Sequence, residues 1–198
     1  LVSEIFSYDP AKTFIFTSPA FWIFFLVVLA GLTIFYRKMF ARNFYLLLVS
    51  LFFYFKTGGL FLFLLVFVTL IDYTCGLMIH KSATKAGKRI SLLLSVVSNI
   101  GLLAYFKYTG FIVQTINDLF GTEIIVRDVL GALSNSLLGT SFDISSIILP
   151  VGISFFTFQS LSYTIDMYRM KLEPVRNIFD FGFYVSFFPQ LVAGPIVR

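Results

Sequence analysis

Four polar side chains recur at helical spacing within the apolar stretch Leu149–Arg169. Gln159, Ser162, Tyr163 and Asp166 stand at positions i, i+3, i+4 and i+7, so on a helix they share one face. In a helix this apolar, polar groups are expensive and normally face protein or a water-filled cavity. The stripe therefore predicts either the wall of a passage for a polar substrate or hydrogen bonds between helices. The sequence leaves both open.

Three further residues have side chains that could do chemistry. Asp72 lies inside another apolar run, but no second catalytic group accompanies it, which favours an ion pair or hydrogen bond between two helices. His80, the single histidine, adjoins Lys81, where solvent and positive charge do not suit a catalytic base. Cys75, the single cysteine, is typical of a small apolar filler. We assign no catalytic residue and no metal site within these 198 residues.

The composition indicates a polytopic membrane protein. Of the 198 residues 58% are hydrophobic and only 13% are charged, whereas soluble domains carry about 25% charged residues. The formal net charge is +5, but no basic surface with base-reading elements accompanies it, so we expect no nucleic-acid partner.

Apolar runs predict an all-α fold with about five transmembrane helices. The expected spans are Ala20–Tyr36, Asn43–Phe55 with an extension back to Met39, Leu60–Ile79, Ile90–Phe106 and Ile147–Tyr168. A last apolar run, Ile178–Ile196, is interrupted by Pro189, Gly194 and Pro195, which indicates a broken or re-entrant element.

Two connecting segments carry their own predictions. Lys107–Gly110 is expected to break the fourth span, and Phe111–Phe120 resembles a short amphipathic or interfacial helix. The polar region that follows is expected to hold one more short helix, Ile124–Leu138.

Basic residues are unevenly divided between the two sets of loops. The loops after the first, third and fifth spans hold ten: Arg37, Lys38, Arg42, Lys81, Lys85, Lys88, Arg89, Arg169, Lys171 and Arg176. The other side holds four, Lys12, Lys56, Lys107 and Arg127. By the positive-inside rule this places the N-terminus outside, and we expect a bacterial inner-membrane location.

Two blocks of sequence resemble a known family. LPVGISFFTFQSLSYTIDMYR at Leu149–Arg169 and FGFYVSFFPQLVAGPIVR at Phe181–Arg198 are similar to the membrane-bound O-acyltransferases, and most closely to the membrane subunit of bacterial alginate O-acetylation systems. Weaker matches are RNFYLLLVSLFFYF at Arg42–Phe55, IDYTCGLMI at Ile71–Ile79 and NIGLLAYFKYTGF at Asn99–Phe111.

The resemblance implies transfer of an acetyl group across the membrane toward an exopolysaccharide such as alginate. The donor would be acetyl-CoA or another acyl thioester, with no bound cofactor, and the partners would be the lipid bilayer, a periplasmic acetyltransferase and the polysaccharide acceptor. A ring of helices would enclose a tunnel, with Gln159, Tyr163 and Asp166 near it and Pro189, Gly194 and Pro195 at a re-entrant bend.

The resemblance also implies that the family's catalytic histidine lies beyond residue 198. Residues 1–198 are then expected to be the N-terminal part of a single membrane-embedded acyltransferase domain, inactive by itself. The alternatives are D-alanyl or lipid acyl transfer within the same family, and a transporter or channel. A transporter is less favoured because no internal repeat is found.

Overall fold

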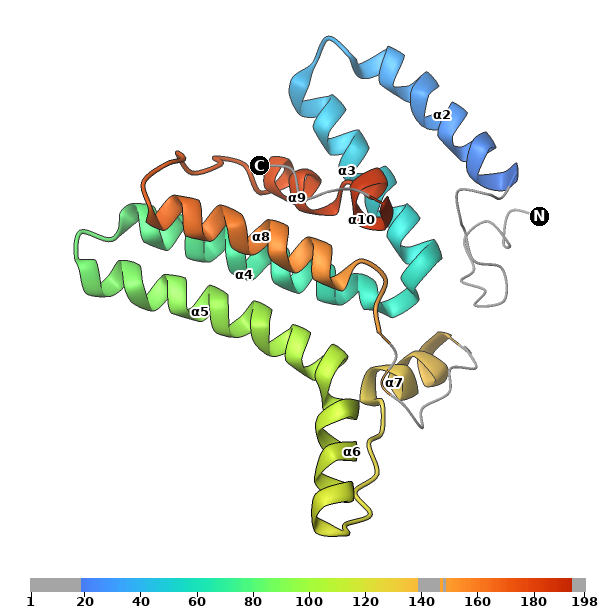
Figure 1. Cartoon of the computed structure of the whole chain (residues 1–198). Helices are drawn as coiled ribbons and strands as arrows, with labels where there is room; N and C mark the ends of the chain where they lie inside the picture. The colour runs from blue at the N-terminus through green and yellow to red at the C-terminus, as the bar shows by residue number, and fades with distance from the viewer. Residues whose placement is uncertain (1–18, 139–146, 148, 194–198) are drawn as a thin grey trace.

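The computed structural model describes residues 19–138, 147 and 149–193, and within them it contains helices and no strand (Figure 1). The predicted all-α class is therefore confirmed. Two continuous helical stretches, Met39–Lys81 and Lys85–Phe120, are long and apolar enough to cross a membrane by length and composition. The number of about five spans stays a prediction.

The helices follow one another with short connections. In chain order they are α2 (Pro19–Phe35), α3 (Met39–Gly58), η1 (Gly59–Phe61), α4 (Leu62–Lys81), α5 (Lys85–Leu103), η2 (Ala104–Tyr108), α6 (Thr109–Phe120), α7 (Val129–Leu138), α8 (Ile153–Tyr168), α9 (Ile178–Ser186) and α10 (Phe188–Ala193).

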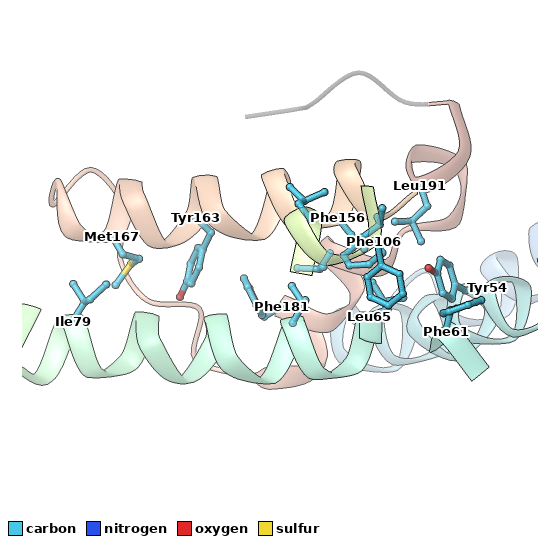
Figure 2. Close-up of a cluster of buried hydrophobic side chains, with 14 residues drawn as sticks. Tyr54, Phe61, Leu65, Ile79, Phe106, Phe156, Tyr163, Met167, Phe181 and Leu191 are labelled. Atoms are coloured by element: carbon cyan, nitrogen blue, oxygen red, sulfur yellow. The ribbon is translucent and has the colours of Figure 1, made fainter. Parts of the chain in front are cut away.

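The centre of the fold is the packing of α4, α5 and α8 against one another (Figure 1). α4 and α8 run in the same direction, and Leu65 and Ile79 of α4 face Phe156 and Met167 of α8 across an apolar interior (Figure 2). Phe181 of α9 fills the space beside them. Burial of these large apolar side chains in contact with each other aligns the two helices.

The second group of helices is built on α3. α9 lies between α3 and α4, and at its start Asn43 Nδ2 donates to Asp180 Oδ1 at 2.8 Å. α2 packs on α3 through aromatic rings, including an edge-on contact between Phe21 and Phe53 with centroids 6.0 Å apart. Aromatic pairs of this geometry add to the stabilisation that comes from burial alone.

A glycine determines where α8 begins. The helix was expected to extend from Ile147, but it starts at Ile153, directly after Gly152, whose φ is +74°. A Cβ at Gly152 would lie 2.7 Å from the carbonyl oxygen of Leu191, so both the backbone angle and the contact require glycine. The close approach also brings α10 against the start of α8.

The structure corrects two other predictions about the connections. The backbone does not break at Lys107–Gly110, because a π-helical turn, η2, joins α5 to α6 and lets the chain change direction while staying helical (Figure 1). The predicted helix Ile124–Leu138 is shorter, since α7 begins at Val129. Asp128 causes the late start, because its Oδ1 accepts from the backbone N–H of Gly131 at 2.9 Å, as an N-cap residue does.

Candidate functional site

A buried carboxylate lies where α4, α5 and α8 meet. Asp72 of α4 is 0% exposed and accepts three side-chain donors. Ser95 Oγ donates to Asp72 Oδ1 at 2.6 Å, and Asn99 Nδ2 lies 3.0 and 2.8 Å from the two carboxylate oxygens. Ser160 Oγ of α8 donates to Asp72 Oδ2. Thr164 Oγ1 extends the group, 2.8 Å from Ser95 Oγ. We name these five residues the Asp72 cluster.

The cluster is arranged to hold helices together. Two serine hydroxyls and an amide supply hydrogen-bond donors to the carboxyl oxygens of Asp72. Within the described part of the chain no Lys, Arg or His forms an ion pair with Asp72, so these hydrogen bonds offset the cost of burying its carboxyl group. The sequence-based interpretation of Asp72 as a hydrogen bond between helices is confirmed.

The partners of Asp72 were missed at the sequence level. Ser95 and Asn99 stand four residues apart on α5, and Ser160 and Thr164 stand four residues apart on α8. Each pair therefore shares a helix face within an otherwise apolar run. That spacing was the available signal, but only the packing of α4, α5 and α8 shows that both pairs meet the same carboxylate.

The predicted stripe on α8 lies on a different face, toward α9. Gln159 is buried, and its Nε2 donates to the backbone oxygen of Tyr184 in α9 at 2.6 Å. Tyr163 is also buried; its hydroxyl accepts from the backbone N–H of Val175 at 3.3 Å, and its ring lies 4.6 Å from that of Phe181.

The other two members of the stripe lie closer to solvent. Ser162 Oγ donates to the backbone oxygen of Gln159 in its own helix, at 2.8 Å. Asp166 is half-buried, and its carboxylate forms no hydrogen bond or ion pair with the residues that the structure describes. The structure thus brings Gln159 and Tyr163 to one interface and leaves Asp166 a turn nearer the end of the helix. A tunnel-lining role for the three stays a prediction.

The broken last element has its interruption before Pro189. α9 ends at Ser186, Phe187 is non-helical with ψ 108°, and α10 starts at Phe188 with Pro189 in its first turn, where proline is favoured. Gly194 and Pro195, the other residues predicted at the bend, lie outside the described residues.

No metal centre is found among the described residues, since no group of three or more His, Cys, Asp and Glu side chains could hold an ion there. Cys75 is buried, as expected of an apolar filler, and it lines a groove of about 330 Å³ on the outer side of α4 and α5. A second groove, of about 430 Å³, lies between α6 and the extended segment at Ile124–Val126. Neither groove is lined by Asp72 or by Gln159, Tyr163 or Asp166.

Comparison with curated proteins finds O-acetylases. The chain is 36% identical over 189 residues to the "probable alginate O-acetylase AlgI" of Pseudomonas aeruginosa, an alignment that covers 93% of this chain and 33% of that protein. The protein of the same name from Azotobacter vinelandii is also 36% identical, with 93% and 34% covered. The chain is a relative of the bacterial alginate O-acetylases. The predicted resemblance to the membrane-bound O-acyltransferases is confirmed.

A relative with a different acceptor in its name matches over a longer alignment. The "peptidoglycan O-acetyltransferase" of Helicobacter pylori is 31% identical over 227 residues, covering 100% of this chain and 40% of that protein. The chain therefore spans about a third of the length of the curated O-acetylases that it matches. No protein-family profile and no solved structure matches the chain.

Proposed function

We propose that this chain forms part of an integral-membrane O-acyltransferase that moves acetyl groups from a thioester donor, acetyl-CoA or another acyl thioester, to hydroxyl groups of a polysaccharide. The observation that carries the proposal is 36% identity to proteins named alginate O-acetylase over 93% of the chain. An exopolysaccharide such as alginate is the first candidate acceptor. Peptidoglycan is the second, favoured by the match to the Helicobacter pylori enzyme.

The helices contribute a dry enclosure rather than the reacting groups. A hydroxyl that attacks a thioester needs a base within hydrogen-bond reach and the exclusion of water, which would otherwise hydrolyse the donor. The carboxylate of Asp72 is fully buried and already accepts three donors, so we do not assign it as that base. The base is expected to be the family's histidine beyond residue 198, and the periplasmic partner that passes the acetyl group to the polymer is likewise expected from the resemblance.

The arrangement of the ends supports the proposed orientation in the inner membrane. Because α4 and α8 are parallel, their C-terminal ends lie together, and Lys88 Nζ at the start of α5 lies 3.7 Å from Met170 Sδ, which follows α8. At the opposite end Tyr54 Oη donates to the backbone oxygen of Val151 at 2.9 Å. The basic loops therefore occupy one end of the helices, which we propose faces the cytoplasm, with the N-terminus outside.

The proposal is tested with membranes that contain the full-length protein carrying this chain, together with its periplasmic partner. Acetyl-CoA labelled in its acetyl group is supplied, and ester-linked label is measured on added alginate and on peptidoglycan. Label on either polymer supports acetyl transfer, and the polymer labelled identifies the acceptor. A D-alanyl thioester supplied in parallel tests the alternative donor. Folded protein that transfers neither group, with its partner present, would refute the proposal.

A further inference from the structure

The outer side of the α4–α5 pair carries an apolar groove of about 330 Å³. Phe67, Leu70, Thr74 and Met78 line it from α4, at positions i, i+3, i+7 and i+11, and Leu94 closes it from α5. At ~1.5 Å per residue the α4 side of the groove is roughly 16 Å long. This is about half of a hydrocarbon core of ~30 Å, so the groove has the depth of one leaflet.

The groove runs toward the basic end of the helix pair. Lys81, the last residue of α4, stands three residues after Met78 and so continues the same helix face. Lys85 and Arg89 in the first two turns of α5 add two more positive charges, and no acidic residue stands between His80 and Arg89. Lys81, Lys85 and Arg89 are exposed, and none of them forms an ion pair or hydrogen bond with the described residues.

We propose that the α4–α5 groove binds one acyl chain of an anionic phospholipid whose phosphate is held by Lys81, Lys85 and Arg89. The apolar lining suits an alkyl chain, and the uncompensated positive charges at its end suit a headgroup with a net negative charge. With Lys88, four basic residues stand in residues 81–89, and clusters of four or more Lys and Arg beside a membrane helix attract anionic lipid in this way, at about fivefold in affinity for each residue. A zwitterionic phospholipid lacks the net charge and gains little from the same cluster.

The inference rests on the membrane embedding in the proposed function, and it adds a lipid site to it. The site is separate from the Asp72 cluster, because Asp72 faces α5 and α8 while the groove lies on the outer side of α4. Lipid bound there would join α4 and α5 on the surface where no other described helix supports them.

The experiment reconstitutes the protein in vesicles of phosphatidylcholine and phosphatidylglycerol in equal amounts. The protein is then extracted in mild detergent, and the phospholipids that remain bound are counted by mass spectrometry. We expect phosphatidylglycerol to be enriched over phosphatidylcholine, and Lys81→Gln and Arg89→Gln each to lower that enrichment by about fivefold. Thr74→Trp, which fills the groove, should lower it as well.

Matched controls separate a site from general attraction. Lys107→Gln removes a positive charge at the other end of the helices, and Leu93→Trp places the same bulky side chain at an exposed position of α5 outside the groove. Both should leave the enrichment unchanged. If Thr74→Trp reduces the yield of folded protein, Leu70→Phe is a smaller filling of the same groove and should also lower retention.

Three results would overturn the inference: equal retention of both lipids, loss of enrichment in the control variants, or full enrichment in the groove-filling variants. Failure of the unmodified protein to insert into the vesicles at all would instead contradict the proposed membrane function.

Discussion

Replacement of Asp72 measures how strongly three helices depend on one carboxylate. Asp72→Ala removes the acceptor of Ser95, Asn99 and Ser160 and leaves their donors buried without it. Hydrogen bonds between membrane helices contribute on average about 0.6 kcal/mol and at most about 1.7 kcal/mol each. Three of them give roughly 2 to 5 kcal/mol, which is a large part of the stability of a typical domain. We therefore expect Asp72→Ala to lower the unfolding temperature sharply.

Asp72→Asn should be tolerated much better, for a reason that the structure supplies. Oδ1 of Asn99 is buried and has no hydrogen-bond partner among the described residues, while its Nδ2 donates to Asp72. If the Asn99 amide rotates, its Oδ1 can accept from the new amide, and the oxygen retained at position 72 still accepts from one of the two hydroxyls, Ser95 or Ser160, which bond to different carboxylate oxygens. We expect Asp72→Asn to cost less than half as much as Asp72→Ala.

The two variants are compared by thermal unfolding of purified protein in detergent, monitored by size-exclusion chromatography after heating. Asp166→Ala is the control, because Asp166 is a half-buried carboxylate whose side chain has no partner in the described part of the chain. Equal destabilisation by Asp72→Asn and Asp72→Ala would refute the reasoning, since it would mean that the charge matters and the hydrogen bonds do not. An Asp72→Ala protein as stable as the unmodified one would refute it as well.

Three further predictions concern other positions in the chain. Gly76→Ala should lower the free energy of unfolding by about 1 to 3 kcal/mol, because the added Cβ would lie 2.6 Å from the ring of Tyr163 in α8. Gly101→Ala is the control: its Cβ meets nothing within 4 Å, so it should be neutral or stabilising. Thermal unfolding of the two purified variants checks both. If Asp166 lines a tunnel, Asp166→Leu should abolish acetyl transfer while the yield of folded protein stays normal. An equal loss of transfer activity and of folded protein would favour a structural role. In a cysteine-free background Thr84→Cys and Glu123→Cys should react with an impermeant maleimide from opposite sides of the membrane, and reaction from the same side would contradict the proposed orientation.

Local patterns in the sequence were enough to predict the helices. Long apolar runs near basic residues gave α3, α4 and α5 near their expected positions, because a long and predominantly apolar segment has few alternatives to a buried or membrane helix. The errors lie where a single residue decides the outcome. Gly152 starts α8 late, Asp128 starts α7 late, and the π-helical turn η2 absorbs a change of direction that was expected to be a break.

The candidate site was only half predictable, because its contacts join distant segments. Asp72 could be singled out, since a carboxylate in an apolar run needs a partner. Its partners are 23 to 88 residues away in the chain, and apolar periodicity does not say which helix faces lie together. The same limit applies to Gln159, whose acceptor is a backbone oxygen of Tyr184 and carries no signal of its own in the sequence.

α8 is held on two sides, and this determines where a substrate could approach it. Ser160 and Thr164 are engaged by the Asp72 cluster, and Gln159 is engaged by α9. A polar substrate that used any of these three would have to displace a buried hydrogen bond, which costs the full desolvation of the group left behind. Asp166 carries no such cost, because its carboxylate has no partner among the described residues and is half-buried. Of the tunnel residues predicted on α8, it is therefore the one that a passing polar group can reach without disturbing the packing of the helices.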